Sequence, residues 1–436
     1  MSNASVLTMN GAFDAFEGDV LVEGGRITAV GRSLVPPAGS RIIDAAGDYL
    51  LPGFVQTHIH LCQTLFRGYA DDRALLEWLR TRIWPMEAAH TPTSLKASVA
   101  LAADELLRGG TTTVLTMETV HDTDAVFEAL APLGIRAVVG KCMMDADAEV
   151  PRRLLEQTQA SIDESVALAR RWHGQADGRL RAAFAPRFAV SCSRELLEAV
   201  AVLSREHGLL VHSHASENRS EIELVRARTG LGNIRYLADV GLADRHVCLA
   251  HCVWLDAEEQ RLIAERRVQV LHCPGSNLKL GSGIAPIAEL RRLGVSVSLG
   301  ADGAACNNSL DMFQEMRLAA TLQAVRAGPG VLPAREVVSM ATRGGAAALG
   351  LDAEIGTIEA GKRADLILIR RSQPHQVPDP DPYGTLVYAT RATDVRTVLV
   401  GGEILIDDSR AVRWESAEVV QTGRAEARAL AARAGI

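Results

Sequence analysis

The stretch LLPGFVQTHIH, residues 50–60, is an apolar segment that ends in two histidines, His58 and His60. Residues two positions apart in a β-strand point to the same face, so the pattern predicts a buried strand with two imidazoles side by side at its end. Neutral imidazole nitrogen is a good ligand for Zn²⁺ and for other divalent first-row metals. A structural histidine pair would give the same pattern, so its meaning depends on the rest of the chain.

After residue 50, short β-branched apolar segments alternate with longer amphipathic ones, which is typical of βα units around a parallel sheet. The eight candidate strands are Gly53–His60, Thr111–Glu118, Ile135–Met143, Leu180–Val190, Leu209–His214, Val247–Cys252, Val268–Cys273 and Val295–Asp302. The candidate helices include Pro92–Arg108, Arg152–Trp172, Arg194–His207, Ala257–Arg266 and Ile287–Leu293. Eight such units over about 300 residues predict an α/β fold of the (β/α)₈ TIM-barrel type. The second choice is an open doubly wound sheet, but no G-x-G-x-x-G motif follows the first strand.

The two ends of the chain share a different pattern, with short strands and turn signals. Glycine pairs at residues 24–25 and 401–402 are typical of hairpin turns. Strands divided between the two ends predict one small β-sandwich assembled from both termini. The expected units are this sandwich at residues 1–52 and 355–412, the barrel at 53–354, and a C-terminal helix rich in Ala, Glu and Arg at 413–436.

Composition excludes several classes of function. The chain has 436 residues and a net charge of −7, and no basic cluster marks it as a binder of nucleic acid or of a membrane surface. No apolar run approaches the length that spans a bilayer, and the first residues lack the pattern of a signal peptide. The seven cysteines form no Cys-x-x-Cys pair. An odd number of cysteines in apolar segments fits a reducing compartment, so we expect a cytoplasmic protein.

Polar residues gather at the ends of the candidate strands. They are His58 and His60 after the first strand, His212, His214 and Glu217 around the end of the fifth, His251 after the sixth, His272 after the seventh and Asp302 after the eighth. The carboxyl ends of barrel strands meet on one face, and active sites lie there. One buried histidine is usually structural, but this joint pattern predicts a metal site.

Four of these residues form the expected ligand set. His58, His60 and His214 supply nitrogen and Asp302 supplies oxygen, which leaves one position open for water, as a catalytic Zn²⁺ site needs. The metal lowers the pKa of that water towards roughly 7. Fe²⁺ suits the same ligands. The fourth strand ends in APRF, residues 185–188, without a lysine that could bridge two metals, so one metal is expected.

The remaining polar residues are assigned to proton transfer or to support. Asp302 is expected to take the proton of the attacking water, and Glu217 to carry a proton to a substrate nitrogen. His251 is expected to hydrogen-bond the metal-bound water. His212 and His272 are expected to support the ligands from outside or to be structural.

The chain resembles the amidohydrolase superfamily over nearly its whole length. The motifs that carry the resemblance are PGFVQTHIH at 52–60, HASE at 214–217, LAHC at 249–252, GAD at 300–302 and GTIEAGKRADL at 356–366. A glutamate after the fifth-strand histidine is typical of its mononuclear deaminases of purines, pyrimidines and related heterocycles. The resemblance implies hydrolytic deamination of a small heterocycle, and a homodimer.

Several segments resemble guanine deaminases. They are GKCMMD at 140–145, EQT at 156–158, PRFAVSCS at 186–193 and SHASENR at 213–219, and Gln63 also fits. The resemblance implies that Gln63 and Arg187 read the donors and acceptors along the edge of guanine, that Phe188 stacks on its ring, and that Glu217 contacts the substrate. The structural alternatives are a salt bridge for Arg187 and barrel packing for Phe188.

One segment departs from this group. GAACNNSLDMF at 303–313 resembles the deaminases of S-adenosylhomocysteine, methylthioadenosine and related adenine nucleosides, and also the s-triazine hydrolases; LFRG at 65–68 has the same character. Those enzymes typically carry histidine at the position of Arg187. The main prediction is therefore zinc-dependent conversion of guanine to xanthine and ammonia. The alternatives are an S-adenosylhomocysteine, methylthioadenosine or adenosine deaminase, an 8-oxoguanine deaminase, and an s-triazine aminohydrolase.

Two other classes of protein are considered. A binuclear amide-bond hydrolase would need a bridging lysine on the fourth strand, and the sequence has none there. A barrel that has lost catalysis and serves as a scaffold is expected to have lost metal ligands, whereas this chain keeps the whole set.

Overall fold

The opening stretch crosses between two sheets in the computed structural model, which describes residues 1–146 and 150–436. It forms β4 (Tyr49–Pro52) in one sheet and β5 (Phe54–Ile59) in the other. Gly53 joins them, and a β-carbon there would lie 2.1 Å from the Thr112 hydroxyl. Only glycine therefore lets the chain pass so close to its neighbour.

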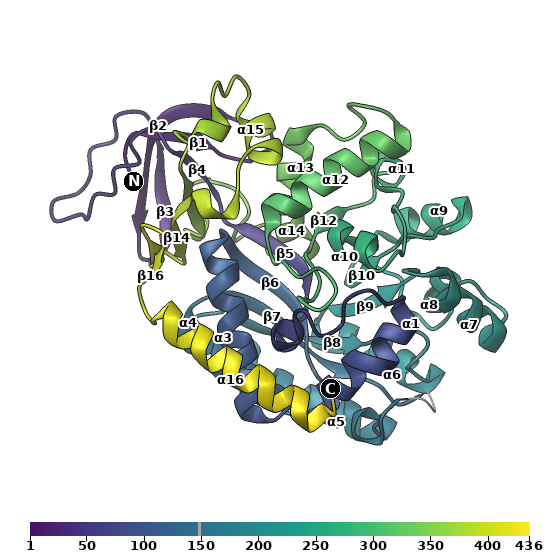
Figure 1. The fold of residues 1–436 in the computed structure, drawn as a ribbon. Coiled ribbons are helices and arrows are strands. Elements are labelled where there is room, and N and C mark those ends of the chain that lie inside the picture. The colour runs from purple at the N-terminus through teal and green to yellow at the C-terminus, as the bar shows by residue number, and fades with distance from the viewer. Residues whose placement is uncertain (147–149) are drawn as a thin grey trace.

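The second of these sheets is the predicted barrel (Figure 1). Its strands pair in parallel and in chain order: β5, β6 (Thr111–Met117), β7 (Arg136–Met143), β8 (Leu180–Pro186), β9 (Val211–Ala215), β10 (Val247–His251), β11 (Gln269–His272) and β12 (Val297–Leu299). The ring is closed between its first and last strands, because Thr57 Oγ1 donates to the Leu299 carbonyl at 3.0 Å and the Asp302 amide donates to the His58 carbonyl at 3.0 Å. The (β/α)₈ prediction is confirmed.

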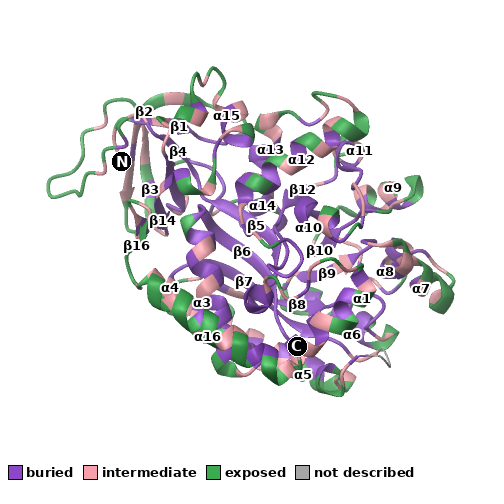
Figure 2. Cartoon of the chain, viewed as in Figure 1, coloured by how far each residue is buried: buried purple, intermediate pink, exposed green. Residues whose placement is uncertain are grey.

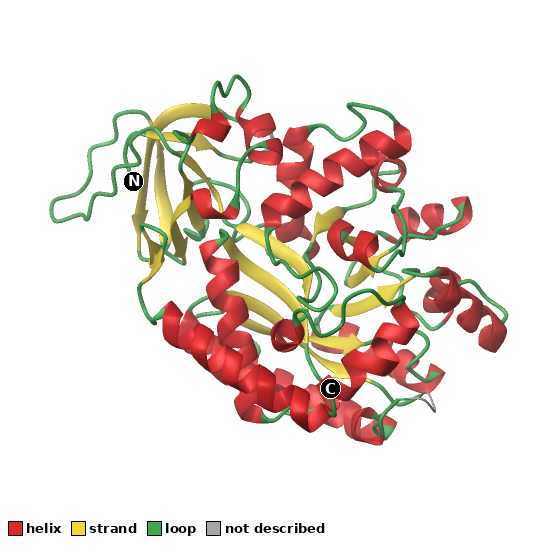
Figure 3. Cartoon of the chain, viewed as in Figure 1, coloured by secondary structure: helices red, strands yellow, loops and turns green. Residues whose placement is uncertain are grey.

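Helices surround the barrel (Figure 3). They are α1 (Leu75–Trp78), η2 (Leu79–Ile83), α2 (Trp84–Ala88), α3 (Pro92–Arg108), α4 (Thr123–Leu133), α5 (Thr158–Trp172), α6 (Arg194–His207), α7 (Arg219–Thr229), α8 (Asn233–Asp239), α9 (Ala257–Arg266), α10 (Pro274–Lys279), α11 (Ile287–Arg292), α12 (Met312–Ala327), α13 (Ala334–Ala341) and α14 (Arg343–Ala348). Short helical turns η1 (Leu61–Phe66) and η3 (Arg152–Leu154) connect some of them. Local sequence sets several starts: Thr91 and Ser94 cap α3 reciprocally, as Asp256 and Glu259 cap α9.

Several predicted elements differ in their bounds from those observed, among them the eighth strand, which spans Val297–Leu299 instead of Val295–Asp302. The helix expected over Arg152–Trp172 is broken into η3 and α5, because the Glu156 side chain pairs with Lys141 and its amide donates to the Met144 carbonyl. The fourth strand ends at Pro186 instead of Val190. After Pro186 the chain turns towards β9, and the Arg187 carbonyl accepts a hydrogen bond from the His214 amide at 3.0 Å.

The two ends of the chain build the other sheet, as expected. Its strand order is β16 (Arg410–Ala411), β15 (Glu403–Asp407), β14 (Val395–Val400), β13 (Leu366–Ile369), β4, β1 (Ala4–Leu7), β2 (Ala15–Glu23) and β3 (Arg26–Gly31). The remaining C-terminal elements are η4 (Pro374–Gln376), α15 (Pro382–Tyr388), η5 (Ala392–Asp394) and α16 (Ser416–Ala434). A buried ion pair, Arg136 Nε to Asp365 Oδ2 at 2.9 Å, ties this sheet to β7. The exact unit boundaries remain a prediction.

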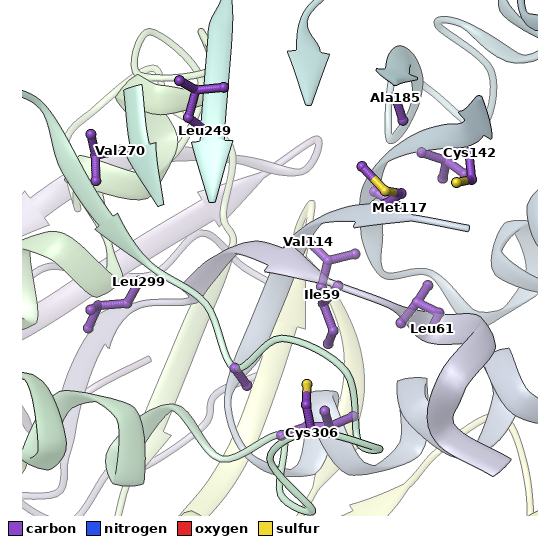
Figure 4. Packing of buried hydrophobic residues seen from close by; sticks show 14 of the residues in the cluster. Ile59, Leu61, Val114, Met117, Cys142, Ala185, Leu249, Val270, Leu299 and Cys306 are labelled. Carbon is purple, nitrogen blue, oxygen red and sulfur yellow. The ribbon is translucent and has the colours of Figure 1, made fainter. Parts of the chain in front are cut away.

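The core is continuous through the barrel, and exposure is confined to its outer surface and the loops (Figure 2). Ile59, Leu61 and Val114 are fully buried within it and lie close together in Figure 4. The final helix α16 lies along α3 (Figure 1), where Trp414 Nε1 donates to Asp104 Oδ1 at 2.8 Å. Within the described residues no helix has both the length and the apolar character that a bilayer span requires.

Candidate active site

Three histidines and one aspartate converge at the carboxyl end of the barrel. His58 and His60 come from β5, His214 from β9, and Asp302 from the turn after β12. Asp302 Oδ1 lies 3.2 Å from both His58 Nε2 and His60 Nε2, and His60 Nε2 lies 3.2 Å from His214 Nε2. All four potential ligand atoms lie within 4.8 Å of one another.

The protonation of these imidazoles calls for a cation. His60 Nδ1 donates to the Met117 carbonyl at 2.8 Å and His214 Nδ1 to the Arg187 carbonyl at 2.7 Å. Since a carbonyl only accepts, each Nδ1 carries the proton, and the two Nε2 lone pairs face each other. His58 Nε2 is buried and has no hydrogen-bond partner among the described residues. Three such nitrogens and one carboxylate oxygen fit a Zn²⁺ ion that has an open fifth position.

Burial favours the neutral forms of His58 and His214, as metal binding requires. It lowers the pKa of His58 to about 4 against the opposing effect of Asp302, and it lowers the pKa of His214 well below its usual value. Burial would raise the pKa of the Asp302 carboxyl, but the histidines around it hold that pKa well below its usual value. His212 supports the set from behind, with Nε2 at 2.7 Å from His58 Nδ1.

Glu217 and His251 lie beside this cluster. His251 Nε2 is 3.6 Å from Glu217 Oε2 and 3.9 Å from Asp302 Oδ2. Burial raises the pKa of Glu217 to about 7, against the opposing effects of His251 and of a 3.0 Å hydrogen bond donated by Ser282. Burial would lower the pKa of His251, but the carboxylates of Glu217 and Asp302 outweigh it and raise that pKa. Glu217 can therefore exchange a proton near neutral pH.

Backbone conformation aims these side chains inward. His251 and Asp302 have φ values of 72° and 63°, and Ser216, one residue before Glu217, has a φ of 54°. This left-handed region is unfavourable for residues with a β-carbon, and such strain concentrates at functional sites. The turns after β9, β10 and β12 therefore hold the polar residues of the site in costly conformations.

The pocket in front of the cluster has a polar floor and an apolar wall. The floor includes His60, Gln63, Arg187, His214, Glu217, Glu221, His251 and Asp302. The wall is made by Leu75, Trp78, Leu79, Phe188 and Leu280. Leu75, Trp78 and Leu79 come from the segment between β5 and α3, which covers the mouth of the barrel (Figure 1). The expected residues Gln63, Arg187 and Phe188 all line this pocket.

Arg187 is already paired. Its Nη1 lies 2.6 Å from Glu87 Oε2 and its Nη2 lies 3.2 Å from Glu87 Oε1, and both side chains are buried. Gln63 Nε2 donates to the same Glu87 at 3.0 Å. The salt-bridge alternative for Arg187 is therefore present in the structure. Glu87 was missing from the sequence analysis, since a lone glutamate in an amphipathic stretch gives no signal of burial.

His272 does not join the metal cluster. It is buried at the end of β11, neither ring nitrogen has a partner among the described residues, and burial lowers its pKa to about 3. The sequence analysis also missed Ser276, Asn277 and Ser282, which follow β11 and contact the polar residues of the site. Their signal is weak, because serine and asparagine after a strand are ordinary loop residues.

The model of the amidohydrolase family matches residues 49–405 of the chain. The chain is 41% identical over 411 residues to a 5′-deoxyadenosine deaminase of Methanothermobacter thermautotrophicus, covering 94% of each chain. It is 42% identical over 415 residues to a 5-methylthioadenosine/S-adenosylhomocysteine deaminase of Symbiobacterium thermophilum, covering 94% of this chain and 93% of the relative.

Solved structures agree with the fold and with a metal site. A zinc-bound adenosine deaminase from Xanthomonas campestris superposes with a TM-score of 0.90 at 31% identity, covering 98% of both chains. A guanine deaminase from C. acetobutylicum gives a TM-score of 0.82 at 27% identity, covering 92% of this chain and 98% of the other. These findings favour the adenine-nucleoside alternative over the main prediction of guanine. The chain belongs to the amidohydrolase family and is a metal-dependent aminohydrolase.

Proposed function

We propose that this enzyme hydrolytically deaminates the adenine ring of a 5′-deoxy or 5′-thio-substituted adenosine, giving the matching inosine compound and ammonia. The observation that carries the proposal is identity of about two residues in five over nearly the full chain to relatives with those activities. The sequence analysis favoured guanine on Arg187 and Phe188. Because Arg187 is engaged by Glu87, it gives less support for reading a guanine carbonyl.

His58, His60, His214 and Asp302 are proposed to hold one Zn²⁺. The facing lone pairs of His60 and His214 support this assignment, since without a cation they would repel each other. A bound Zn²⁺ would supply the Lewis acidity that makes water nucleophilic at neutral pH. Elemental analysis of the purified protein would distinguish Zn²⁺ from Fe²⁺.

Three residues are proposed to move protons. Asp302 Oδ2 and His251 Nε2 face one point, where they can orient the attacking water and take its proton. Glu217 contacts the substrate and, with its pKa raised to about 7 chiefly by burial, can deliver a proton to ring nitrogen N1 of adenine. Attack of water at C6 forms the new C–O bond. The proton taken from the water passes to the exocyclic amine, the C6–N bond breaks as ammonia leaves, and the remaining hydroxyl proton returns to Glu217 as the C6 carbonyl forms.

The apolar wall fits the proposed substituent. Trp78, Leu79 and Leu280 are among the apolar residues that line the pocket, and an apolar 5′ group such as a methyl or methylthio group would bury its surface against them favourably. Phe188 is proposed to pack against the flat purine. A charged or strongly polar 5′ group would lose hydration where it meets these apolar side chains.

The test is ammonia release from the zinc-loaded protein. Parallel substrates are 5′-deoxyadenosine, methylthioadenosine, S-adenosylhomocysteine, adenosine, guanine, 8-oxoguanine and a hydroxylated s-triazine, and protein stripped of metal is the control. We expect the highest kcat/KM with a 5′-deoxy or 5′-thio nucleoside. A higher kcat/KM with guanine or the triazine would overturn the proposed substrate. The homodimer implied by the resemblance is a separate proposal that analytical ultracentrifugation would check.

A further inference from the structure

The short helix α10 (Pro274–Lys279) contacts two of the proton-handling groups through consecutive residues. Ser276 Oγ donates to Asp302 Oδ2 at 2.6 Å, and Asn277 Oδ1 lies 2.9 Å from His251 Nδ1. Both side chains are buried. Neither Ser276 nor Asn277 is among the residues that line the pocket, so both would act on the reaction through Asp302 and His251.

The Ser276 contact gives the two carboxylate oxygens of Asp302 different surroundings. Oδ1 lies against the histidine nitrogens and also accepts from the Gly303 amide at 2.7 Å, whereas Oδ2 is turned towards His251. A carboxylate held on both oxygens cannot rotate about its last bond. The Ser276 hydroxyl therefore fixes which oxygen faces the ligand cluster and which faces the site of proton transfer.

The Asn277 contact orients His251. An amide oxygen accepts hydrogen bonds only, so the proton of this pair sits on His251 Nδ1. Nε2 is then directed between Glu217 Oε2 at 3.6 Å and Asp302 Oδ2 at 3.9 Å. The Asn277 Nδ2 atom has no hydrogen-bond partner among the described residues, whereas its Oδ1 contacts His251.

A buried carboxyl anchors α10 from the other side. Glu315, in the first turn of α12, accepts from the Gly275 amide at 3.0 Å and from Asn307 Nδ2 at 2.8 Å. Asn307 Nδ2 also donates to the Ala301 carbonyl, one residue before Asp302, at 2.8 Å. A β-carbon at Gly275 would lie 2.5 Å from Glu315 Oε1. Glu315 and Asn307 thus link α10 to the turn that carries Asp302.

We propose that Ser276 and Asn277 are positioning residues: Ser276 sets the two oxygens of Asp302, and Asn277 sets the ring of His251, so that both face the attacking water. The two act through different partners. Asp302 belongs to the ligand set and His251 does not, so loss of Ser276 must affect metal retention and catalysis, and loss of Asn277 must affect catalysis alone.

The Asn277 arm of the test is a double-mutant cycle. We expect Asn277→Leu to lower kcat on the order of 10²-fold with KM and zinc content unchanged, because a small displacement of a reacting group has that cost. Asn277→Asp keeps the accepting oxygen and should recover most of the lost kcat. In a His251→Ala background, Asn277→Leu should add little. An equal further loss in that background would overturn the role of Asn277.

The Ser276 arm uses zinc retention as a second readout. We expect Ser276→Ala to lower kcat about 10–100-fold and to speed the loss of zinc to a chelator by a similar factor. Asn277→Leu should lose zinc at the wild-type rate. Wild-type kcat and zinc retention in Ser276→Ala would overturn the role of Ser276.

Controls separate positioning from simple stability. Leu278→Ala changes a half-exposed residue of the same helix and should leave kcat, zinc retention and the melting temperature close to wild type. If Ser276→Ala and Asn277→Leu merely loosened α10, both would change zinc retention and kcat in the same proportion. The inference rests on the proposed function only in the choice of the substrate for the assay. If wild type prefers another heterocycle, the proposed substrate fails but the cycle is run on that heterocycle, and the zinc arm needs no substrate.

Discussion

The metal side and the substrate side of the pocket are built in different ways. The candidate ligands His58, His60, His214 and Asp302 stand at the ends of barrel strands, where strand register fixes them. The substrate side is formed by connecting segments: Gln63 in η1, Trp78 in α1, Glu87 in α2 and Arg187 after β8. The candidate metal ligands are thus fixed by the sheet and the proposed substrate contacts by connecting segments, so changes on the two sides should have separable effects.

The largest effect should come from Glu217, which links the two sides. We expect Glu217→Gln to lower kcat by about 10²–10⁴-fold, the range for loss of a general acid, with zinc content unchanged. His214→Ala is the matched change on the metal side and should lose both zinc and turnover. Elemental analysis and ammonia release check both variants. Loss of zinc in Glu217→Gln would show that Glu217 belongs to the metal side.

The pair of Arg187 and Glu87 should give the next largest effect, on stability. Glu87→Ala leaves a buried guanidinium without its carboxylate, which should cost about 3–5 kcal/mol of unfolding free energy. The double variant Glu87→Leu with Arg187→Met removes both charges and should be less destabilised than either single change. Denaturant unfolding measures this cycle.

Variants of the same ion pair also decide the role of Arg187 in substrate recognition. If Arg187 contacts the purine, Arg187→Ala should lower kcat/KM by a factor that corresponds to about 2–4 kcal/mol of activation free energy. This loss should remain after the loss of stability is accounted for. If its role is structural, the refolded double variant should keep most of the nucleoside turnover. The second outcome would place Arg187 with the scaffold instead of the substrate contacts.

The sequence predicted that the four candidate ligands come together because their convergence follows from periodicity. A two-residue repeat put His58 and His60 on one face, and parallel strands brought His214 and Asp302 to the same end of the barrel. The substrate side has no such rule. Arg187 was visible in the sequence, but its partner Glu87 lies 100 residues earlier in a segment without strong periodicity, so the ion pair that occupies Arg187 could not be anticipated.

A smaller effect, on KM, is expected when the apolar wall is changed. Trp78→Ala removes apolar surface from the pocket mouth and should raise KM for methylthioadenosine by about tenfold, the scale of lost pocket contacts. Adenosine, whose 5′ group is a hydroxyl, should be affected much less. The ratio of the two kcat/KM values is the measurement. Equal losses for both nucleosides would mean that Trp78 closes the pocket without contacting the 5′ group.

The smallest expected effect is a shift in the pH dependence of kcat when Ser282 is replaced. Glu217 must be protonated to deliver a proton, and its pKa is raised to about 7, chiefly by burial, so kcat should fall as the pH rises through about 7. The Ser282 hydroxyl donates to Glu217 Oε1 and favours the charged form. Ser282→Ala removes that donor, so the pKa of Glu217 should rise and the basic limb should move upward on the order of one pH unit. Below pH 6 the rate should barely change. A limb that moves downward would mean that the ionised form of Glu217 is the active one, which would make this residue a base and assign the proton delivered to N1 to another group.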